Sequence, residues 1–194
     1  MPFQKKKALF FVEGETEVEF YNKILSKYFL SLPKKIINLH GNSNIYRKIL
    51  GETNEHLRRN ENDIVRIYCC IDRESRYHNP PLNINELITL LKDKFKKNFL
   101  SAEQIIATQM IESWFFHDIE GIYKFLSVPK AERKPHFFTP VQKLTHIHLS
   151  SLFERYGKLY IKGKKCKFFL DNIDLIKIYE ESEELQRGLK KIKK

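Results

Sequence analysis

Two short acidic clusters follow apolar segments of this sequence, and their residue types suit a hard divalent cation. Glu13-Gly14-Glu15-Thr16-Glu17 comes directly after the apolar segment 8–12, and Asp72-Arg73-Glu74 comes directly after 64–71. If these segments are neighbouring strands, up to four carboxylates converge, which is unfavourable without a cation because like charges raise one another's pKa. Carboxylate oxygens in this number suit Mg²⁺ or Mn²⁺, and two such ions stabilise an in-line displacement at phosphorus.

The acidic residues also have a simpler interpretation. Acidic side chains in the first turn of a helix interact favourably with its dipole, which accounts for Glu15, Glu17 and Glu19 taken singly. Glu13 and Asp72 differ, because each closes a strongly apolar segment without opening a helix itself. A functional role is therefore favoured for those two.

Alternating strands and helices must position these clusters. Continuous apolar segments at 8–12 and 64–71 are typical of strands buried on both faces, and 35–39 and 103–108 are further strand candidates. Gly14 would permit a tight turn into a helix that a Thr16–Glu19 capping box begins. Apolar spacing predicts helices over 16–29, 84–99 and 111–126, a polar helix is expected over about 45–59, and a Pro-containing loop lies at 75–83. The alternation predicts an α/β fold, with a parallel sheet of about four strands flanked by helices.

The pattern loosens after Pro129. A short helix over 147–156 and a polar helix with a basic end over 174–194 are expected there. We therefore predict a domain of residues 1–128 and a basic, mostly helical C-terminal extension of residues 129–194 packed on it.

The net charge points to a polyanionic partner. The sequence has 35 Lys and Arg against 24 Asp and Glu, a formal charge of +11. Each phosphate contact releases counterions, so this surplus favours nucleic acid, although a basic protein without such a partner is the alternative. Lysine-rich stretches occur at 5–7 and 92–97, and twelve Lys or Arg accompany six Asp or Glu between Arg155 and Lys194. Basic residues around an acidic centre are expected where metal ions mediate contact with phosphate.

Other features predict a cytoplasmic protein. No apolar segment is long enough to span a membrane, and the N-terminal apolar segment ends in acid without a cleavage site for a signal peptidase. The three cysteines, of which Cys69 and Cys70 are adjacent, form neither a disulfide framework nor a zinc-binding spacing.

The two acidic clusters resemble a known family. LFFVEGETE at 9–17, followed by YCCIDRE at 68–74, resembles the Toprim domain of topoisomerases, bacterial primases, recombination proteins and nucleases of the overcoming-lysogenization-defect (OLD) type. The EGxTE form is most similar to the OLD group and to small stand-alone Toprim-like proteins of bacteria. The resemblance covers about residues 7–126 and implies that Glu13 assists proton transfer and helps to hold metal. It further implies that Glu17 is a metal ligand and that Asp72 is the first aspartate of the acidic pair.

The sequence departs from this family at the second acidic residue. The usual Asp-x-Asp is Asp-x-Glu here, so Glu74 reaches about one bond further and would bind metal with altered geometry or through water. Related nucleases use an additional downstream glutamate, which Glu112 resembles, although a helix-dipole role is equally open for it. The loop GKLYIKGKK at 157–165 suits contact with phosphate, or is a solvated hairpin. Lys162 or Lys164 in this loop would neutralise transition-state charge.

These observations predict a Mg²⁺- or Mn²⁺-dependent endonuclease that hydrolyses nucleic acid, with DNA favoured over RNA. The predicted metal ligands are Glu13, Glu17, Asp72, Glu74 and Glu112, and the predicted catalytic residues are Glu13, Asp72, Lys162 and Lys164. The resemblance also implies a bacterial phage-defence or mobile-element system with an ATPase partner. The alternative is a catalytically inactive Toprim-like module that binds nucleic acid or a protein partner. A topoisomerase role is disfavoured, because the chain has no room for the extra domains.

Overall fold

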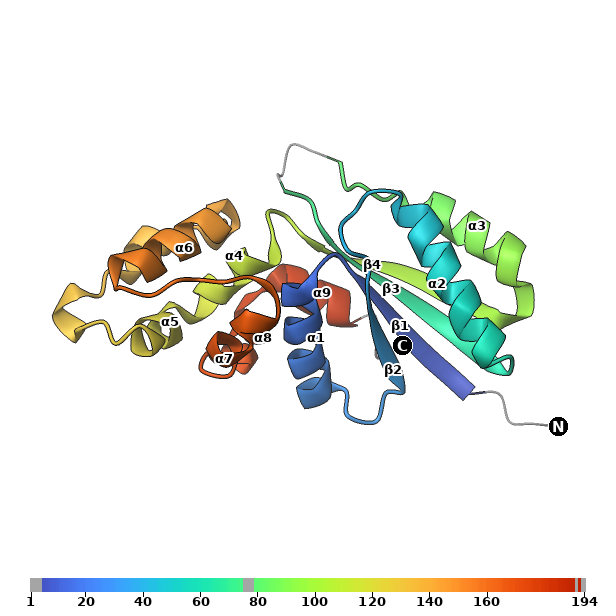
Figure 1. Ribbon diagram of the computed structural model, residues 1–194, viewed down its shortest axis with the longest axis horizontal. Coiled ribbons are helices and arrows are strands. Elements are labelled where there is room, and N and C mark those ends of the chain that lie inside the picture. Colours follow the sequence, from blue (N-terminus) through green and yellow to red (C-terminus); the bar gives the residue numbers. More distant parts are fainter. Residues whose placement is uncertain (1–4, 75–78, 191, 193–194) are drawn as a thin grey trace.

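A four-stranded, all-parallel sheet organises the chain (Figure 1). The structure, a computed structural model, describes residues 5–74, 79–190 and 192, so the predicted loop at 75–83 lies partly outside the described residues. The strand order is β2-β1-β3-β4. The strands are β1 (Lys5–Val12), β2 (Lys34–Asn38), β3 (Asp63–Asp72) and β4 (Phe99–Ala107). The predicted α/β class and parallel sheet are confirmed.

Helices connect and flank the strands. Before β4 they are α1 (Glu15–Tyr28), α2 (Ile45–Arg59), α3 (Ile84–Phe95) and the short η1 (Lys96–Asn98). After β4 come α4 (Ile111–Phe115), η2 (Phe116–Asp118), α5 (Ile119–Phe125), η3 (Lys130–Glu132), η4 (Pro135–Phe138), η5 (Val141–Lys143), α6 (His146–Arg155), η6 (Gly163–Cys166), α7 (Lys167–Leu170), α8 (Leu175–Glu181) and α9 (Glu183–Lys190). In the described residues no helix is both long and apolar enough to cross a membrane.

Two apolar cores lie on opposite faces of the sheet, as the alternation of side chains along a strand requires. Leu9 and Phe11 of β1 point toward α2 and α3, whereas Phe10 and Val12 point toward α1 and the chain after β4. The Phe10 ring stacks on Tyr68 of β3 with a centroid distance of 4.7 Å. Figure 1 shows α2 and α3 on one side of the sheet, with α1 and the C-terminal helices on the other.

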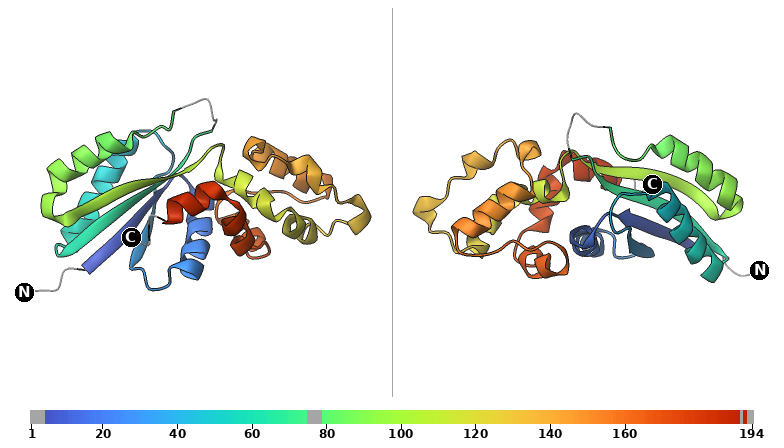
Figure 2. Two further views of the ribbon diagram at one scale, coloured as in Figure 1. Left: turned by 180° about the vertical axis from the view of Figure 1, so that it is seen from behind. Right: turned by 45° about the horizontal axis from the view of Figure 1, so that its top comes forward.

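The C-terminal chain completes the core on the α1 face. Helix α9 packs against β4, which Figure 2 shows from behind. A Cβ on Gly188 would lie 2.6 Å from Cγ2 of Ile105, so this close approach requires glycine. Apolar residues of α7, α8 and α9 belong to the same buried cluster as Phe10 and α1. The segment from α5 to α6 extends away from the sheet (Figure 1).

The strand order explains why the two acidic clusters lie together. After β1 the chain forms β2 on one side of it, and then crosses to place β3 on the other side. In open parallel sheets, ligands bind beyond the carboxyl ends of the strands at the point where the order reverses in this way. Glu13 directly follows β1 and Asp72 ends β3, so both lie at that point.

Four helical predictions were wrong in detail. The predicted helix over 84–99 ends at Phe95; the short η1 follows, and Phe99 already belongs to β4. The Thr16–Glu19 capping box does not form, since α1 begins at Glu15 without a side-chain cap. The predicted helix over 111–126 is interrupted at η2, where the Asp118 carboxylate accepts hydrogen bonds from the Gly121 and Asp174 amides. The predicted helix over 174–194 is interrupted at Ser182, which separates α8 from α9.

Candidate acidic site

Glu13 lies at the carboxyl end of the central strand β1. Its Oε1 accepts a hydrogen bond of 3.1 Å from the Asp72 amide, and its carbonyl accepts one of 2.7 Å from Gly41. Burial raises the pKa of the Glu13 carboxyl from 4.5 to about 7; the Asp72 hydrogen bond opposes this rise, and the Glu17 and Glu74 carboxylates add to it. Glu13 is therefore a carboxyl that can gain or lose a proton near neutral pH.

Asp72 closes β3 beside Glu13. Its Oδ1 accepts a hydrogen bond of 3.2 Å from the Ile111 amide at the start of α4. Burial raises its pKa well above 3.8, and the carboxylates of Glu17, Glu112 and Glu13 raise it further, while Lys162 opposes them. Four acidic side chains, from α1, β3, α4 and the residue that follows β1, thus act on one another electrostatically.

Glu17 reaches this cluster from the first turn of α1. Its pKa is raised by burial and then by Glu112, while backbone N–H groups and Lys162 lower it. Gly14 has an extended backbone with a φ of −150°, so the expected need for a glycine turn does not explain it. Its missing side chain leaves room for Glu17, because a Cβ there would lie 3.0 Å from Glu17 Oε2.

Glu112 is the most deeply buried acidic side chain of the group, with 1% of its surface exposed. Its Oε1 accepts a hydrogen bond of 3.3 Å from the Tyr160 hydroxyl and lies 3.2 Å from Lys162 Nζ. Its Oε2 is buried and has no hydrogen-bond partner among the described residues. An unpartnered buried carboxylate oxygen is costly, so a helix-dipole role does not account for this side chain.

Residues 157–163, here called the strap, bring the basic loop over the site. The Gly163 amide donates a 2.8 Å hydrogen bond to Thr16 Oγ1, and Gly163 adopts a left-handed φ of +80°. Residues 158–162 of the strap form neither helix nor strand, so the hairpin considered for it does not form. Tyr160 and Lys162, two residues apart, both reach Glu112. Burial and Glu112 raise the pKa of Tyr160, so its hydroxyl stays protonated and donates.

Some residues of the pocket were predicted from the sequence, and others were not. Glu74 lines the same pocket as Asp72, although it is exposed and its left-handed φ of +64° breaks the expected strand alternation. The side chain of Lys164 lies outside the described residues, and its backbone belongs to η6. Tyr160 and Thr16 were not predicted as site residues. Their signal was present, since Tyr160 alternates with Lys162 and Thr16 separates two of the glutamates.

The side chains surround one open pocket of about 530 Å³ at the carboxyl edge of the sheet. Its ionisable lining includes Glu13, Glu17, Asp72, Glu74, Glu112 and Lys162. Among the described residues, no three His, Cys, Asp or Glu side chains already form a cluster that could hold a metal ion. The pocket thus gathers hard oxygen donors without a preset coordination geometry.

The fold and this site define a class: a parallel α/β protein with an acidic pocket where the strand order reverses. The chain belongs to the family DUF4276, described as a domain of unknown function, which matches residues 12–193. The match covers β2, β3, β4, the strap and the C-terminal helices, and it begins at Val12, the last residue of β1. Comparison with curated proteins finds no match, and comparison with solved structures finds none.

Proposed function

We propose that the protein is a metal-dependent phosphodiester hydrolase that acts on nucleic acid. The observation that carries this proposal is the convergence of Glu13, Glu17, Asp72 and Glu112 on one pocket, with Lys162 as their cationic neighbour. Burial raises the pKa of Glu13 and Asp72 in this pocket, and carboxyl groups perturbed in this way are typical of catalytic sites. The resemblance of the EGETE and DRE motifs to Toprim nucleases supports the same activity.

The donor set fits Mg²⁺ or Mn²⁺. These ions prefer carboxylate oxygens, and the pocket offers the carboxylates of Glu13, Glu17, Asp72, Glu74 and Glu112. The buried Oε2 of Glu112 has no partner in the described chain, and burial, together with repulsion from neighbouring carboxylates, raises the pKa of Glu17 and Asp72. A bound divalent cation would relieve both costs, and it would supply an activated water and stabilise the leaving oxygen.

The chain's own groups would then divide the remaining work. Glu13, which follows β1 and accepts a hydrogen bond from the Asp72 amide, would accept a proton from the attacking water. Lys162 has half of its side chain exposed, at 51%, and can turn from Glu112 toward a phosphate oxygen. The Tyr160 hydroxyl keeps Glu112 oriented toward the pocket.

The proposal is tested by incubating supercoiled plasmid and structured RNA with the purified protein and Mg²⁺ or Mn²⁺. We expect metal-dependent cleavage that is lost in Glu13→Ala and Asp72→Ala. Glu52→Ala, which changes an exposed glutamate of α2, is the matched control and should cleave normally. Cleavage that survives both site substitutions would exclude this pocket as the active site.

Calorimetry separates the enzyme from a non-catalytic binding module. Binding of Mn²⁺ that weakens in Asp72→Ala favours the enzyme, whereas no binding at millimolar Mn²⁺ favours the module. DNA as the preferred substrate, a role in phage defence and an ATPase partner remain predictions from the resemblance. Parallel assays on DNA and RNA address the first of these directly.

A further inference from the structure

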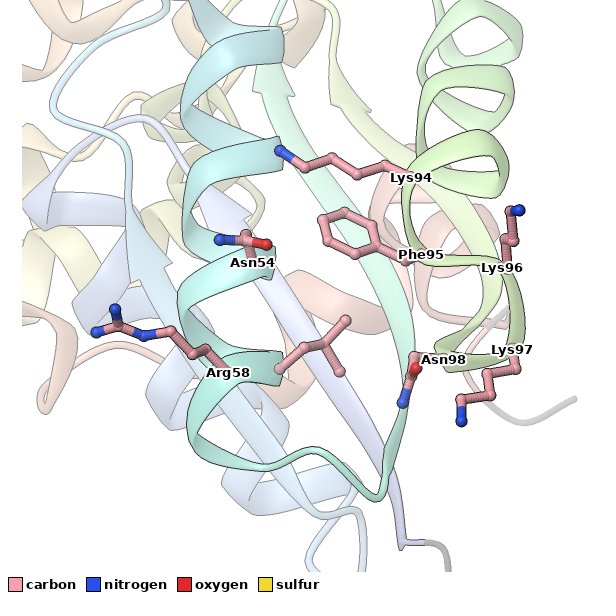
Figure 3. A pocket seen from close by; sticks show the side chains of 8 residues that line it. Asn54, Arg58, Lys94, Phe95, Lys96, Lys97 and Asn98 are labelled. Atoms are coloured by element: carbon pink, nitrogen blue, oxygen red, sulfur yellow. The ribbon is translucent and has the colours of Figure 1, made fainter.

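A basic cleft lies between the carboxyl ends of α2 and α3 (Figure 3). It has a volume of about 590 Å³, and its charged lining residues are Arg58, Lys94, Lys96 and Lys97. No acidic side chain of the described residues lines it. The molecule therefore has one pocket lined mainly by acidic side chains and one cleft whose charged lining is entirely basic.

Helix dipoles account for only part of this charge. Cations in the last turn of a helix are favourable, which suits Arg58 in α2 and Lys94 in α3. Arg58 also pairs with Glu55 at 3.3 Å. Lys96 and Lys97 follow the end of α3 and, with Lys94, form no ion pair within the described chain. Cations gathered around one cleft without counter-charges repel one another, and a bound anion relieves that repulsion.

The floor of the cleft is apolar and its rim is cationic. Leu57 and Phe95 form the floor, and Lys94 Nζ lies 5.6 Å from the centre of the Phe95 ring. Figure 3 shows Lys94 extending from α3 toward α2 across this ring. The Asn98 side chain anchors the wall by donating 2.9 Å hydrogen bonds to the carbonyls of Glu61 and Asp63. These hydrogen bonds hold the backbone segment that carries Lys96 and Lys97.

We propose that the basic cleft is a second contact for the phosphate backbone of nucleic acid, separate from the acidic pocket. The inference rests on the proposed function for the identity of the polyanion. Asp63, which Asn98 contacts, begins β3, and Asp72 ends it nine residues later. At about 3.3 Å per residue the two sites lie about 30 Å apart. A duplex rises about 3.4 Å per base pair, so about nine base pairs separate the two contacts.

The first test measures binding without metal, so that it does not depend on cleavage. Fluorescence anisotropy in EDTA compares a 24-base-pair duplex on the wild type, Lys94→Glu/Lys97→Glu and Lys124→Glu/Lys130→Glu. The control pair makes the same charge change at exposed lysines of α5 and η3. In the cleft variant, Lys94→Glu/Lys97→Glu, we expect the affinity for the duplex to fall about tenfold. The slope of log K against log salt should be less steep than in the wild type by about 2 or more, and the control should change little. If the glutamate variant does not fold, Lys94→Gln/Lys97→Gln replaces it in the assay. This milder change removes two positive charges and should lower the salt slope by about 2.

The second test uses substrate length in the presence of Mn²⁺. The cleft variant should raise KM for the 24-base-pair duplex and leave kcat/KM for a 6-base-pair duplex unchanged, because the short duplex cannot reach both sites. Equal affinity of the cleft variant and the wild type in EDTA would overturn the inference while leaving a cleaving enzyme in place. Binding that depends on the cleft in a protein that never cleaves would instead refute the proposed function alone.

Discussion

Replacing Glu13 by glutamine should stabilise the metal-free protein at alkaline pH. Glutamine keeps the shape and the oxygen that accepts the Asp72 amide hydrogen bond, and it removes only the charge. In the folded protein the Glu13 pKa is raised from 4.5 to about 7, so its charged form is disfavoured by folding. The stability that this group contributes is complete below pH 4.5 and is lost as the pH rises through 7.

The raised pKa sets the size of the effect. A rise from 4.5 to about 7 corresponds to about 3 kcal/mol of unfolding free energy above pH 7. Because Glu13 is only partly buried, solvent screening lowers the expected gain to about 1–2 kcal/mol. At pH 4.5 and below the two proteins should be nearly equal, since the carboxyl is mostly protonated in the folded state.

Urea unfolding in EDTA at pH 4.5, 6 and 8 measures this difference. Glu13→Gln should gain stability over the wild type progressively between pH 4.5 and 8, and the exposed-site control Glu52→Gln should follow the wild type throughout. Saturating Mn²⁺ should reverse the order at pH 8, because the wild type binds the ion more tightly. If Glu13→Gln is no more stable than the wild type at pH 8, then burial and repulsion do not make the charged Glu13 carboxylate destabilising.

Two further substitutions test other parts of the structure. Lys162→Ala removes the cation that lowers the pKa of Glu17 and Asp72, so the acidic limb of the pH–rate profile for plasmid cleavage should move to higher pH. An unchanged limb would mean that Lys162 does not act on these carboxyls. Gly188→Ala would place a Cβ 2.6 Å from Ile105 Cγ2 and should cost about 1–3 kcal/mol in urea unfolding, without changing the cleavage rate of the folded fraction. Wild-type stability in this variant would contradict the close packing of α9 on β4.

Local sequence signals located all four strands and the acidic positions at the ends of β1 and β3, although β4 begins at Phe99, four residues before the predicted 103–108. The apolar segments 8–12 and 64–71 became β1 and β3, and Glu13 and Asp72 follow and end them as expected. The strand order could not be predicted, because each parallel crossover can lead to either side of β1 and no local residue specifies the choice. That order brings the two carboxyls to the same crevice.

The rest of the site depends on contacts between distant segments. The Thr16 hydroxyl, expected to cap α1, accepts instead from Gly163, which lies 147 residues away in sequence. The burial of Glu112 and its contacts with Tyr160 and Lys162 arise from the same crossing of the strap. Asp118 similarly interrupts a predicted helix because it binds the distant Asp174 amide. Periodicity within a segment carries no information about such partners.

The measurement that tests the central claim most directly is a crystal structure of the protein soaked in Mn²⁺ and recorded at the manganese absorption edge. We expect an anomalous peak within coordination distance of carboxylate oxygens of Asp72 and Glu13, with Glu17 turned toward it and the unpartnered Oε2 of Glu112 engaged. Manganese bound elsewhere, or no anomalous peak in this pocket at millimolar Mn²⁺, would contradict it.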